Sequence, residues 1–296
     1  MKKRVAVIAP TGMLGSMVYN VLKDEYSLVL IYRDKDKLKK LNEVYGGIVK
    51  HKKIRFDFKD VYDDFSAGFT NKRVSPKLMD LVKKIGPVSA VINCAGLTKP
   101  NSLKDPATTL FVNGALPHLL ANIYREKLIQ ITTDCIFDGV KGAPYDETSS
   151  HNPNDFYGLS KDLGEPGDRS LVLRTSIIGP EIDGYYLLIE WFKKQEGKTA
   201  RGFSNHLWNG VTTREFAKIC DKIISMRKSF PKSGIFHIFS TVVSKYEMLL
   251  AFREKYKVDC KIVRDSKPKL DRRLSTIYSL NKKLGIPTFY EMLEEL

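Results

Sequence analysis

Short apolar runs alternate with amphipathic stretches along the first 180 residues of the chain. The runs of four to six residues predict strands, and their nearly continuous apolar character is typical of parallel strands buried on both faces. The stretches between them repeat apolar residues every three to four positions, which predicts helices. Strands are expected at 5–8, 27–32, 53–56, 88–93, 127–131 and 170–174, and helices at 14–23, 76–85 and 112–124.

Strands that alternate with helices form βαβ units, so the pattern predicts an α/β fold with a doubly wound parallel sheet. Beyond residue 180 the rhythm weakens, with helices expected at 213–226 and 244–256 and a strand at 234–239. We therefore expect a nucleotide-binding domain at 1–178 and a smaller substrate-binding cap at 179–296. Some segments of the cap are expected to return to the first domain.

Composition and charge narrow the classes of function. Hydrophobic residues make up 43% and charged residues 28% of the chain, as in ordinary globular proteins. Since no apolar run approaches the ~20 residues of a membrane helix, we expect no membrane span. The apolar stretch after Arg4 is too short for a signal peptide, which favours a buried first strand and a cytoplasmic protein.

Cysteine and histidine spacing gives no sign of a metal site. The four cysteines form no C-x-x-C pair, and the five histidines show no metal-ligand spacing, so we expect a reducing compartment and no metal. The net charge of +15 comes from scattered lysines without a nucleic-acid-binding motif. We expect no nucleic-acid partner, although the basic surface would attract ligands that carry phosphate.

A glycine-containing turn follows the first predicted strand, in the order Thr11, Gly12, Met13, Leu14 and Gly15. Glycines at this position allow a tight turn and a close approach of the backbone to a pyrophosphate at a helix N-terminus. We therefore predict that these five residues bind a dinucleotide. Ala9 takes the place of the first glycine of the usual pattern, which is acceptable if its φ stays negative.

Arg33 follows the second predicted strand, where NAD enzymes commonly place an acidic residue that holds the ribose 2′-hydroxyl. A guanidinium there suits a 2′-phosphate through paired, charge-assisted hydrogen bonds. The sequence therefore favours NADPH as the cofactor, while Asp34 keeps NADH open.

A tyrosine and a lysine four residues apart follow the fifth predicted strand. Tyr157 and Lys161 share one helix face, and an ammonium near a phenol is expected to lower the phenol pKa. Tyr157 could then give a proton to a carbonyl oxygen while a hydride reaches its carbon. Thr133, at the end of the fifth strand, could hydrogen-bond the same oxygen. With the glycine turn, these residues predict an NAD(P)-dependent oxidoreductase that interconverts a C=O and a CH–OH group.

The chain resembles the extended short-chain dehydrogenases, and within them the dTDP-4-dehydrorhamnose reductase group. The resemblance implies a Rossmann fold and NADPH. It also implies a nucleoside-diphosphate 4-keto-6-deoxyhexose as the substrate, reduced at C4 in deoxysugar or surface-polysaccharide synthesis, by a monomer or homodimer. The matching stretches are 11–15, 93–96, 112–113, 132–139, 145–148, 157–161 and 173–176, with a weaker match at 208–213.

The resemblance also implies roles for individual residues. Tyr157 would be the acid, Lys161 would bind the nicotinamide ribose and tune Tyr157, and Thr133 would contact the substrate carbonyl. Asp57 and Phe58 would flank the adenine. The remaining cofactor contacts would come from Asn93, Cys94, Ala95 and Gly96, which would line the path of the ribose and phosphates.

Several expected substrate contacts depart from the family pattern. Asp134 is in place, but Cys135 stands where the family has an aromatic residue, and Ile177 stands where it has tryptophan. Both positions shape the sugar pocket, so a related sugar such as an N-acetylated deoxyhexose stays open. Asn205 and Trp208 are further candidates for contact with the nucleotide or sugar, and packing is an equally good interpretation of Trp208.

Two other functions fit parts of the pattern. An epimerase or dehydratase that retains NAD is one, although Asp134 is followed by Cys135, where dehydratases have glutamate. A non-catalytic regulator similar to the β subunit of methionine adenosyltransferase is the other. The presence of Thr133, Tyr157 and Lys161 argues against a regulator.

Overall fold

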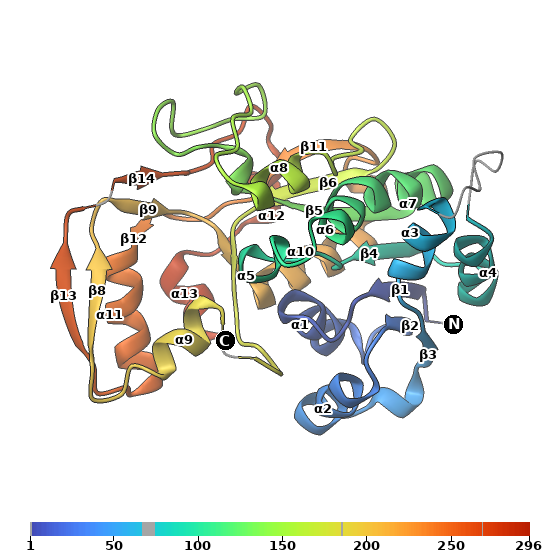
Figure 1. The fold of residues 1–296 in the computed structure, drawn as a ribbon, viewed down its shortest axis with the longest axis horizontal. Coiled ribbons are helices and arrows are strands. Elements are labelled where there is room, and N and C mark those ends of the chain that lie inside the picture. Colours follow the sequence, from blue (N-terminus) through green and yellow to red (C-terminus); the bar gives the residue numbers. More distant parts are fainter. Residues whose placement is uncertain (1, 67–74, 185, 268) are drawn as a thin grey trace.

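A seven-stranded sheet in which every neighbouring pair is parallel forms the centre of one part of the molecule (Figure 1). The computed structural model describes residues 2–66, 75–184, 186–267 and 269–296. The strand order is β11-β6-β5-β4-β1-β2-β3, which confirms the predicted doubly wound α/β fold. The strands are β1 (Arg4–Ile8), β2 (Ser27–Tyr32), β3 (Lys52–Arg55), β4 (Ala90–Asn93), β5 (Leu128–Thr133), β6 (Leu171–Thr175) and β11 (Gly234–His237).

Helices cover both faces of this sheet because alternate strand residues point to opposite sides. Val5 and Val7 of β1 lie in the same apolar cluster as α1 and α10, whereas Ala6 and Ile8 lie in a second cluster with α4 and α7. Both clusters are buried, which explains why the strands read as continuous apolar runs. The helices of this part are α1 (Met13–Leu22), α2 (Lys35–Tyr45), α3 (Lys59–Ser66), α4 (Pro76–Ile85), α5 (Lys99–Ser102), α6 (Pro106–Thr109), α7 (Leu116–Tyr124), α8 (Phe156–Asp162), α10 (Thr213–Ser225) and α12 (Leu280–Leu284).

The helix predicted at 112–124 differs from the structure in one respect. Its first turns form a π-helix, η2 (Leu110–Ala115), between α6 and α7. Wider π turns often mark functional sites, and this one faces the candidate site described below. The chain also has short 3₁₀ turns at η1 (Ile48–Lys50), η3 (Arg125–Lys127), η4 (Asp134–Ile136) and η5 (Arg227–Ser229).

A second part of the molecule, with its own apolar core, lies beside the carboxyl ends of the central strands (Figure 1). Phe252 of α11 and Phe289 of α13 are fully buried in this core, together with Trp208 of β9. Its small sheets pair β8 with β13, β9 with β12 and β14, and β7 with β10. The elements are β7 (Ile177–Ile178), β8 (Thr199–Phe203), β9 (His206–Trp208), β10 (Val211–Thr212), β12 (Val243–Ser244), β13 (Lys261–Asp265), β14 (Leu270–Asp271), α9 (Leu188–Lys193), α11 (Lys245–Tyr256) and α13 (Phe289–Glu294).

Residues beyond 179 contribute to both parts. β11 pairs with β6 at the edge of the central sheet, and residues of α10 pack in the cluster that contains α1. The remaining elements of this half surround the second core. Within the described ranges, no helix combines the length and the apolar character that crossing a membrane requires.

Candidate active site

Tyr157 lies on α8, whose position is fixed by a tight contact with the loop after β5. The Asp155 side chain caps α8 by accepting a hydrogen bond from the Gly158 N–H at 2.7 Å. Position 158 requires glycine, because a Cβ there would lie 2.2 Å from the Cys135 carbonyl oxygen. On this helix the Tyr157 side chain lies close enough to Thr133 for the threonine hydroxyl to lower the pKa of the phenol. The structure thus places the predicted acid, Tyr157, next to Thr133, the residue predicted to contact the same carbonyl oxygen.

The pKa of Tyr157 runs opposite to the sequence-based expectation. Burial raises this pKa, the neighbouring Cys135 raises it further, and the hydrogen bond from Thr133 lowers it by less. Lys161 does not act on the phenol as expected, because its ammonium donates a 2.8 Å hydrogen bond to the Ile131 carbonyl instead. Tyr157 is therefore a protonated phenol at neutral pH, which is the form that a proton donor needs.

Lys161 is 6% exposed and is held beneath the site. Burial lowers its pKa from the usual value of 10.5 to about 8, while Glu165 raises it. Gly96 lies close to this ammonium, since a Cβ at Gly96 would be 4.0 Å from the Lys161 Nζ. Burial also raises the pKa of the nearby Cys94 thiol to about 12, so this thiol is neutral.

Asn113 organises the loop beside Lys161 and was not assigned a role from the sequence. The π-helix η2 directs its buried amide at Leu97, whose N–H donates to Asn113 Oδ1 at 2.9 Å. The Asn113 Nδ2 donates to the Leu97 carbonyl at 3.0 Å and to the Ser160 Oγ at 2.9 Å. Asn93 shapes the start of the same loop by accepting from the Ala95 N–H at 3.1 Å. The loop predicted to line the cofactor path is therefore held by side-chain amides.

The turn after β1 has the geometry of an anion cradle. Gly12 is the N-cap of α1 and offers no side chain to the first helical N–H groups, which leaves them available to a pyrophosphate. A Cβ at Gly15 would lie 2.0 Å from the Ala9 carbonyl oxygen, so this position requires glycine. The expectation of a negative φ at Ala9 is wrong, because its φ is 57°. The missing first glycine therefore leaves a strained alanine in the left-handed region.

The predicted adenosine end lies at the carboxyl ends of β2 and β3. The Asp34 carboxylate caps α2 by accepting hydrogen bonds from the N–H groups of Asp36 at 2.8 Å and Lys37 at 3.2 Å. The carboxylate that could hold a ribose 2′-hydroxyl is therefore already used as a helix cap. The Arg33 side chain is 73% exposed and lies 4.0 Å from Asp57. Phe58 is only 9% exposed and packs in the core, so it supports this end from below.

A cavity of about 290 Å³ opens between the carboxyl ends of the central strands and the second part of the molecule. Asp134, Cys135, Ile177 and Trp208 line it, as predicted substrate contacts should. Asn205 does not line it, and its amide donates to the Ser266 carbonyl at 2.9 Å. The other residues lining the cavity are Met13, Lys99, Ser176, Ile178, Gly179, Leu187, Leu188, His206, Leu207, Lys245, Leu270 and Arg272.

Trp208 combines the two interpretations that the sequence left open. It is 6% exposed and packs edge-to-face against Phe289 at a ring separation of 5.9 Å, and it also forms part of the cavity wall. Sequence reasoning missed the cationic side chains of the cavity, Lys99, Lys245 and Arg272. Lys245 and Arg272 come from element ends far from the motifs, and Lys99 follows the 93–96 motif by three residues, but local spacing gave no signal that the three would meet at one cavity.

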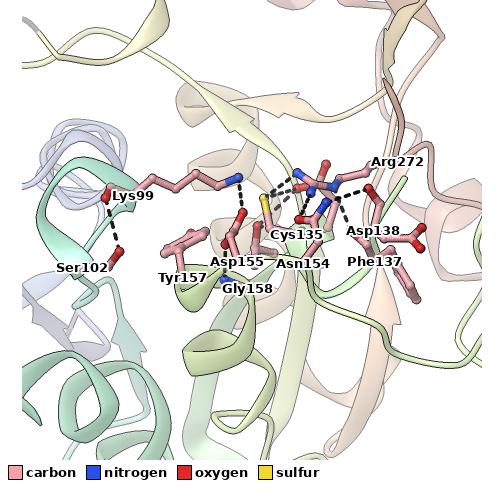
Figure 2. Close-up of polar contacts among 12 residues, drawn as sticks. Lys99, Ser102, Cys135, Phe137, Asp138, Asn154, Asp155, Tyr157, Gly158 and Arg272 are labelled. Carbon is pink, nitrogen blue, oxygen red and sulfur yellow. Dashed lines mark hydrogen bonds and ion pairs between the residues drawn. The ribbon is translucent and has the colours of Figure 1, made fainter. Parts of the chain in front are cut away.

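Cations gather at the cavity around Cys135 (Figure 2). The Arg272 guanidinium donates to the Phe137 carbonyl at 2.7 Å and approaches the Cys135 Sγ at 3.5 Å. Lys99 forms an ion pair with Asp155 at 2.7 Å. Burial lowers the pKa of His206 from 6.5 to about 4, and the nearby cations Lys245, Arg272 and Lys99 contribute to this shift. The imidazole is therefore neutral.

Behind the cavity, a buried arginine joins several loops. The Arg174 guanidinium is almost fully buried and donates to Glu165 at 2.6 Å, to His237 Nε2 at 2.7 Å and to His151 Nε2 at 3.1 Å. Arginine only donates, so both imidazoles must accept through Nε2. His151, Asp162 and Glu165 lie close enough to one another to hold a metal ion, but Arg174 already supplies the positive charge there.

Comparison with known proteins shows the family to which the chain belongs. A family model described as the RmlD substrate binding domain matches residues 66–271. Over 98 residues the chain is 37% identical to dTDP-4-dehydrorhamnose reductase of Streptomyces griseus, a match that covers 30% of this chain and 32% of that protein. Over 186 residues it is 27% identical to methionine adenosyltransferase 2 subunit beta of Danio rerio, covering 56% of this chain and 55% of the relative.

The fold has close counterparts among solved structures. A dTDP-4-dehydrorhamnose reductase from Bacillus anthracis, solved in complex with NADP, superposes with a TM-score of 0.70 at 19% identity, covering 100% of this chain and 98% of the other. Similarity at this level of identity establishes the shared fold. The alignments with the first two curated relatives span only 32% and 34% of those proteins.

Proposed function

The chain belongs to the RmlD substrate-binding domain family, and from this we propose that it is an NADPH-dependent reductase of a nucleoside-diphosphate 4-keto-6-deoxyhexose. The observation that carries the proposal is the position of the Tyr157 side chain next to Thr133, directly before Asp134 and Cys135 of the cavity wall. Two hydroxyls that converge at the end of β5 can both reach one carbonyl oxygen. The similarity to dTDP-4-dehydrorhamnose reductase of Streptomyces griseus supports the substrate class.

The residues of the site suit a carbonyl reduction. Tyr157 would donate its hydroxyl proton to the ketone oxygen, and Thr133 would stabilise the same oxygen with a hydrogen bond as it gains negative charge. The bound nicotinamide would supply the hydride to the ketone carbon, so that C=O becomes CH–OH. The Lys161 ammonium, held at the Ile131 carbonyl, would bind the nicotinamide ribose, as the family resemblance implies.

The same residues fit NADPH in particular. The uncapped N–H groups at the start of α1 and the close Gly15–Ala9 approach would hold the pyrophosphate. Arg33 is exposed and available to a 2′-phosphate, whereas Asp34 is used as a helix cap. The NADP complex of the Bacillus anthracis protein supports the choice of cofactor. We further propose a monomer or homodimer in the cytoplasm, where the NADPH pool would serve it.

A regulatory role is a second candidate because of the similarity to methionine adenosyltransferase 2 subunit beta. Such a protein would bind NADPH but would need no proton donor beside its cavity. The retained hydroxyl pair of Thr133 and Tyr157 favours the reductase.

The deciding experiment follows NADPH absorbance after addition of dTDP- or UDP-linked 4-keto-6-deoxyhexoses. The wild-type protein should oxidise NADPH with at least one of them. Tyr157→Phe should slow turnover by about 10²- to 10⁴-fold, the usual contribution of a positioned general acid. Its affinity for NADPH should stay within about twofold, since the ring and its packing remain. Normal NADPH binding without turnover of any 4-keto sugar nucleotide would refute the reductase and favour the regulator.

A further inference from the structure

His151 joins the helix of Tyr157 to the central sheet from a position outside the substrate cavity, where the proposed chemistry gives it no role. Its Nδ1 lies 2.6 Å from the Oδ1 of Asp162, the last residue of α8. Its Nε2 lies 3.1 Å from the Nη2 of Arg174 on β6. The imidazole therefore forms a bridge between the end of α8 and a central strand.

Only one protonation state of this imidazole satisfies both contacts. A guanidinium has donors and no acceptor, so the His151 Nε2 must accept from Arg174 and carries no proton. The proton is then on Nδ1, which donates a hydrogen bond to the Asp162 carboxylate. A second proton on the ring would set one N–H against another and would place two positive charges side by side. The bridge is thus made by the neutral imidazole.

The sheet end of this bridge is rigid. The Arg174 side chain is 1% exposed, pairs with Glu165 at 2.6 Å and donates to His237 Nε2 at 2.7 Å. Glu165 also lies beside the imidazole, so the charged groups that face it are Asp162, Glu165 and Arg174. Burial, together with Arg174, lowers the pKa of His237 from its usual 6.5. The His151 side chain is 32% exposed and His237 is fully buried, so acid reaches His151 first.

α8 is short, so a shift at its end reaches Tyr157. The helix has seven residues, about 10 Å at 1.5 Å per residue, and carries both Tyr157 and Lys161. Asp155 holds its first turn by accepting from the Gly158 N–H at 2.7 Å (Figure 2). His151 holds its last residue. The two contacts fix the helix at both ends.

We propose that His151 is a positioning residue, which in its neutral form holds the end of α8 against Arg174 and so keeps Tyr157 directed at the substrate carbonyl. A proton on Nε2 would break the contact with Arg174 and loosen the end of the helix. Turnover should then fall toward acid pH, within the range of about pH 8 to 5 in which imidazoles gain charge. The inference rests on the proposed function in taking Tyr157 as the proton donor of a reduction.

Two substitutions separate the hydrogen bonds of His151 from its bulk. The amide of His151→Gln can accept from Arg174 and donate to Asp162, but it does not titrate. His151→Ala removes both contacts. His118→Gln is the matched control, because the His118 Nε2 also contacts the chain just beyond α8, at 2.8 Å from the Leu163 carbonyl. Among the described residues, neither Asp162 nor Arg174 is its hydrogen-bond partner.

The first measurement is NADPH oxidation as a function of pH, with the dTDP- or UDP-linked 4-keto-6-deoxyhexose that the wild type reduces fastest. At about pH 7.5, His151→Ala should lower kcat by about 10- to 100-fold, the cost of a displaced catalytic group, and leave KM for the sugar nucleotide within about twofold. His151→Gln should retain kcat within about threefold and lose the fall at acid pH, whereas His118→Gln should keep that fall.

The second measurement needs no turnover and follows amide hydrogen exchange of α8 in the full chain. Protection of its amides, corrected for the intrinsic effect of pH on exchange, should fall in the wild type between about pH 7.5 and 5.5. Protection should stay constant in His151→Gln, because the amide side chain gains no proton. The glutamine variant decides the question even where His151→Ala fails to fold.

Unchanged kcat in His151→Ala would overturn the proposal. A His151→Gln variant as slow as the alanine variant at every pH would overturn it too, because the imidazole would then act through its shape alone. So would an acid fall in turnover or in α8 protection that persists in His151→Gln. Acid-dependent exchange that requires His151, in a protein that reduces no sugar nucleotide, would keep the positioning role and remove the reductase. Turnover like that of the wild type in all three variants would keep the reductase and remove the positioning role.

Discussion

Ala9→Gly tests the strained turn that carries the predicted pyrophosphate contact. Ala9 has a φ of 57°, in the left-handed region that favours glycine. Its N–H donates to the Ile31 carbonyl at 2.9 Å and its carbonyl accepts from the Gly12 N–H at 3.3 Å, so the neighbouring strand and turn hold it there. Glycine would adopt this conformation without the clash of a Cβ.

The expected size of the effect comes from three terms. Removing the left-handed strain should stabilise the fold by about 1–2 kcal/mol. The extra freedom of glycine in the unfolded chain should cost about 0.5–1 kcal/mol. Loss of a half-buried methyl group should cost about 0.4 kcal/mol, half of the value for a fully buried one. The sum lies between about 0.4 kcal/mol of lost stability and about 1.1 kcal/mol of added stability.

The control is the same chemical change in a helix. Ala251→Gly in α11 should destabilise the protein by about 1 kcal/mol, since the helical backbone gains nothing from glycine. By thermal unfolding of the two variants, Ala9→Gly should melt at least about 1–2 °C above Ala251→Gly. Equal destabilisation by the two substitutions would show that Ala9 is not in a left-handed conformation.

Three further outcomes follow from the site. Arg33→Ala should weaken NADPH by about tenfold and leave NADH unchanged when both are titrated by fluorescence, because only NADPH carries the 2′-phosphate. The steady-state rate should fall as pH rises through about 8, where Lys161 loses its proton, and Lys161→Arg should move this fall to higher pH. Glu165→Gln should lower stability by about 3 kcal/mol in urea unfolding, since it leaves the buried Arg174 charge uncompensated; a loss below about 0.5 kcal/mol would show that the pair behaves like an exposed one.

The sheet was predictable because parallel strands buried on both faces leave a local signal, the continuous apolar run. β1 and β2 lie where they were expected, and the predicted β3, β4, β5 and β6 differ from the structure by at most two residues at either end. β11 was expected as a strand at 234–239, but its pairing with β6 depends on a contact between distant segments. The π turn at Asn113 was missed for a similar reason, since its geometry is set by the contacts of the buried amide with Leu97 and Ser160.

Tyr157, Lys161 and Thr133 were also predictable, because motifs of short spacing place them on one helix and one strand end. The pKa of Tyr157 could not be predicted in the same way. It depends on burial and on the neighbouring Cys135, and only the folded structure shows both. The sequence-based prediction of the family is confirmed by the RmlD model match, which covers residues 66–271 and so includes Thr133, Tyr157 and Lys161 but not the turn at 11–15.

The residues that line the substrate cavity are positioned by other elements than the expected cofactor residues. The expected cofactor residues lie at the ends of neighbouring parallel strands, which must meet at one edge of the sheet in any chain with this strand order. Lys245 and Arg272 instead reach the cavity from the start of α11 and the end of β14, through a core that packs Trp208 against Phe289. Nothing in strand order brings these segments together, so the charge of Lys245 could change without disturbing the sheet or the Tyr157 helix. Substrate choice in this chain should therefore be set by the second core, and variants at Lys245 should alter which ligands bind before they alter the proton transfer.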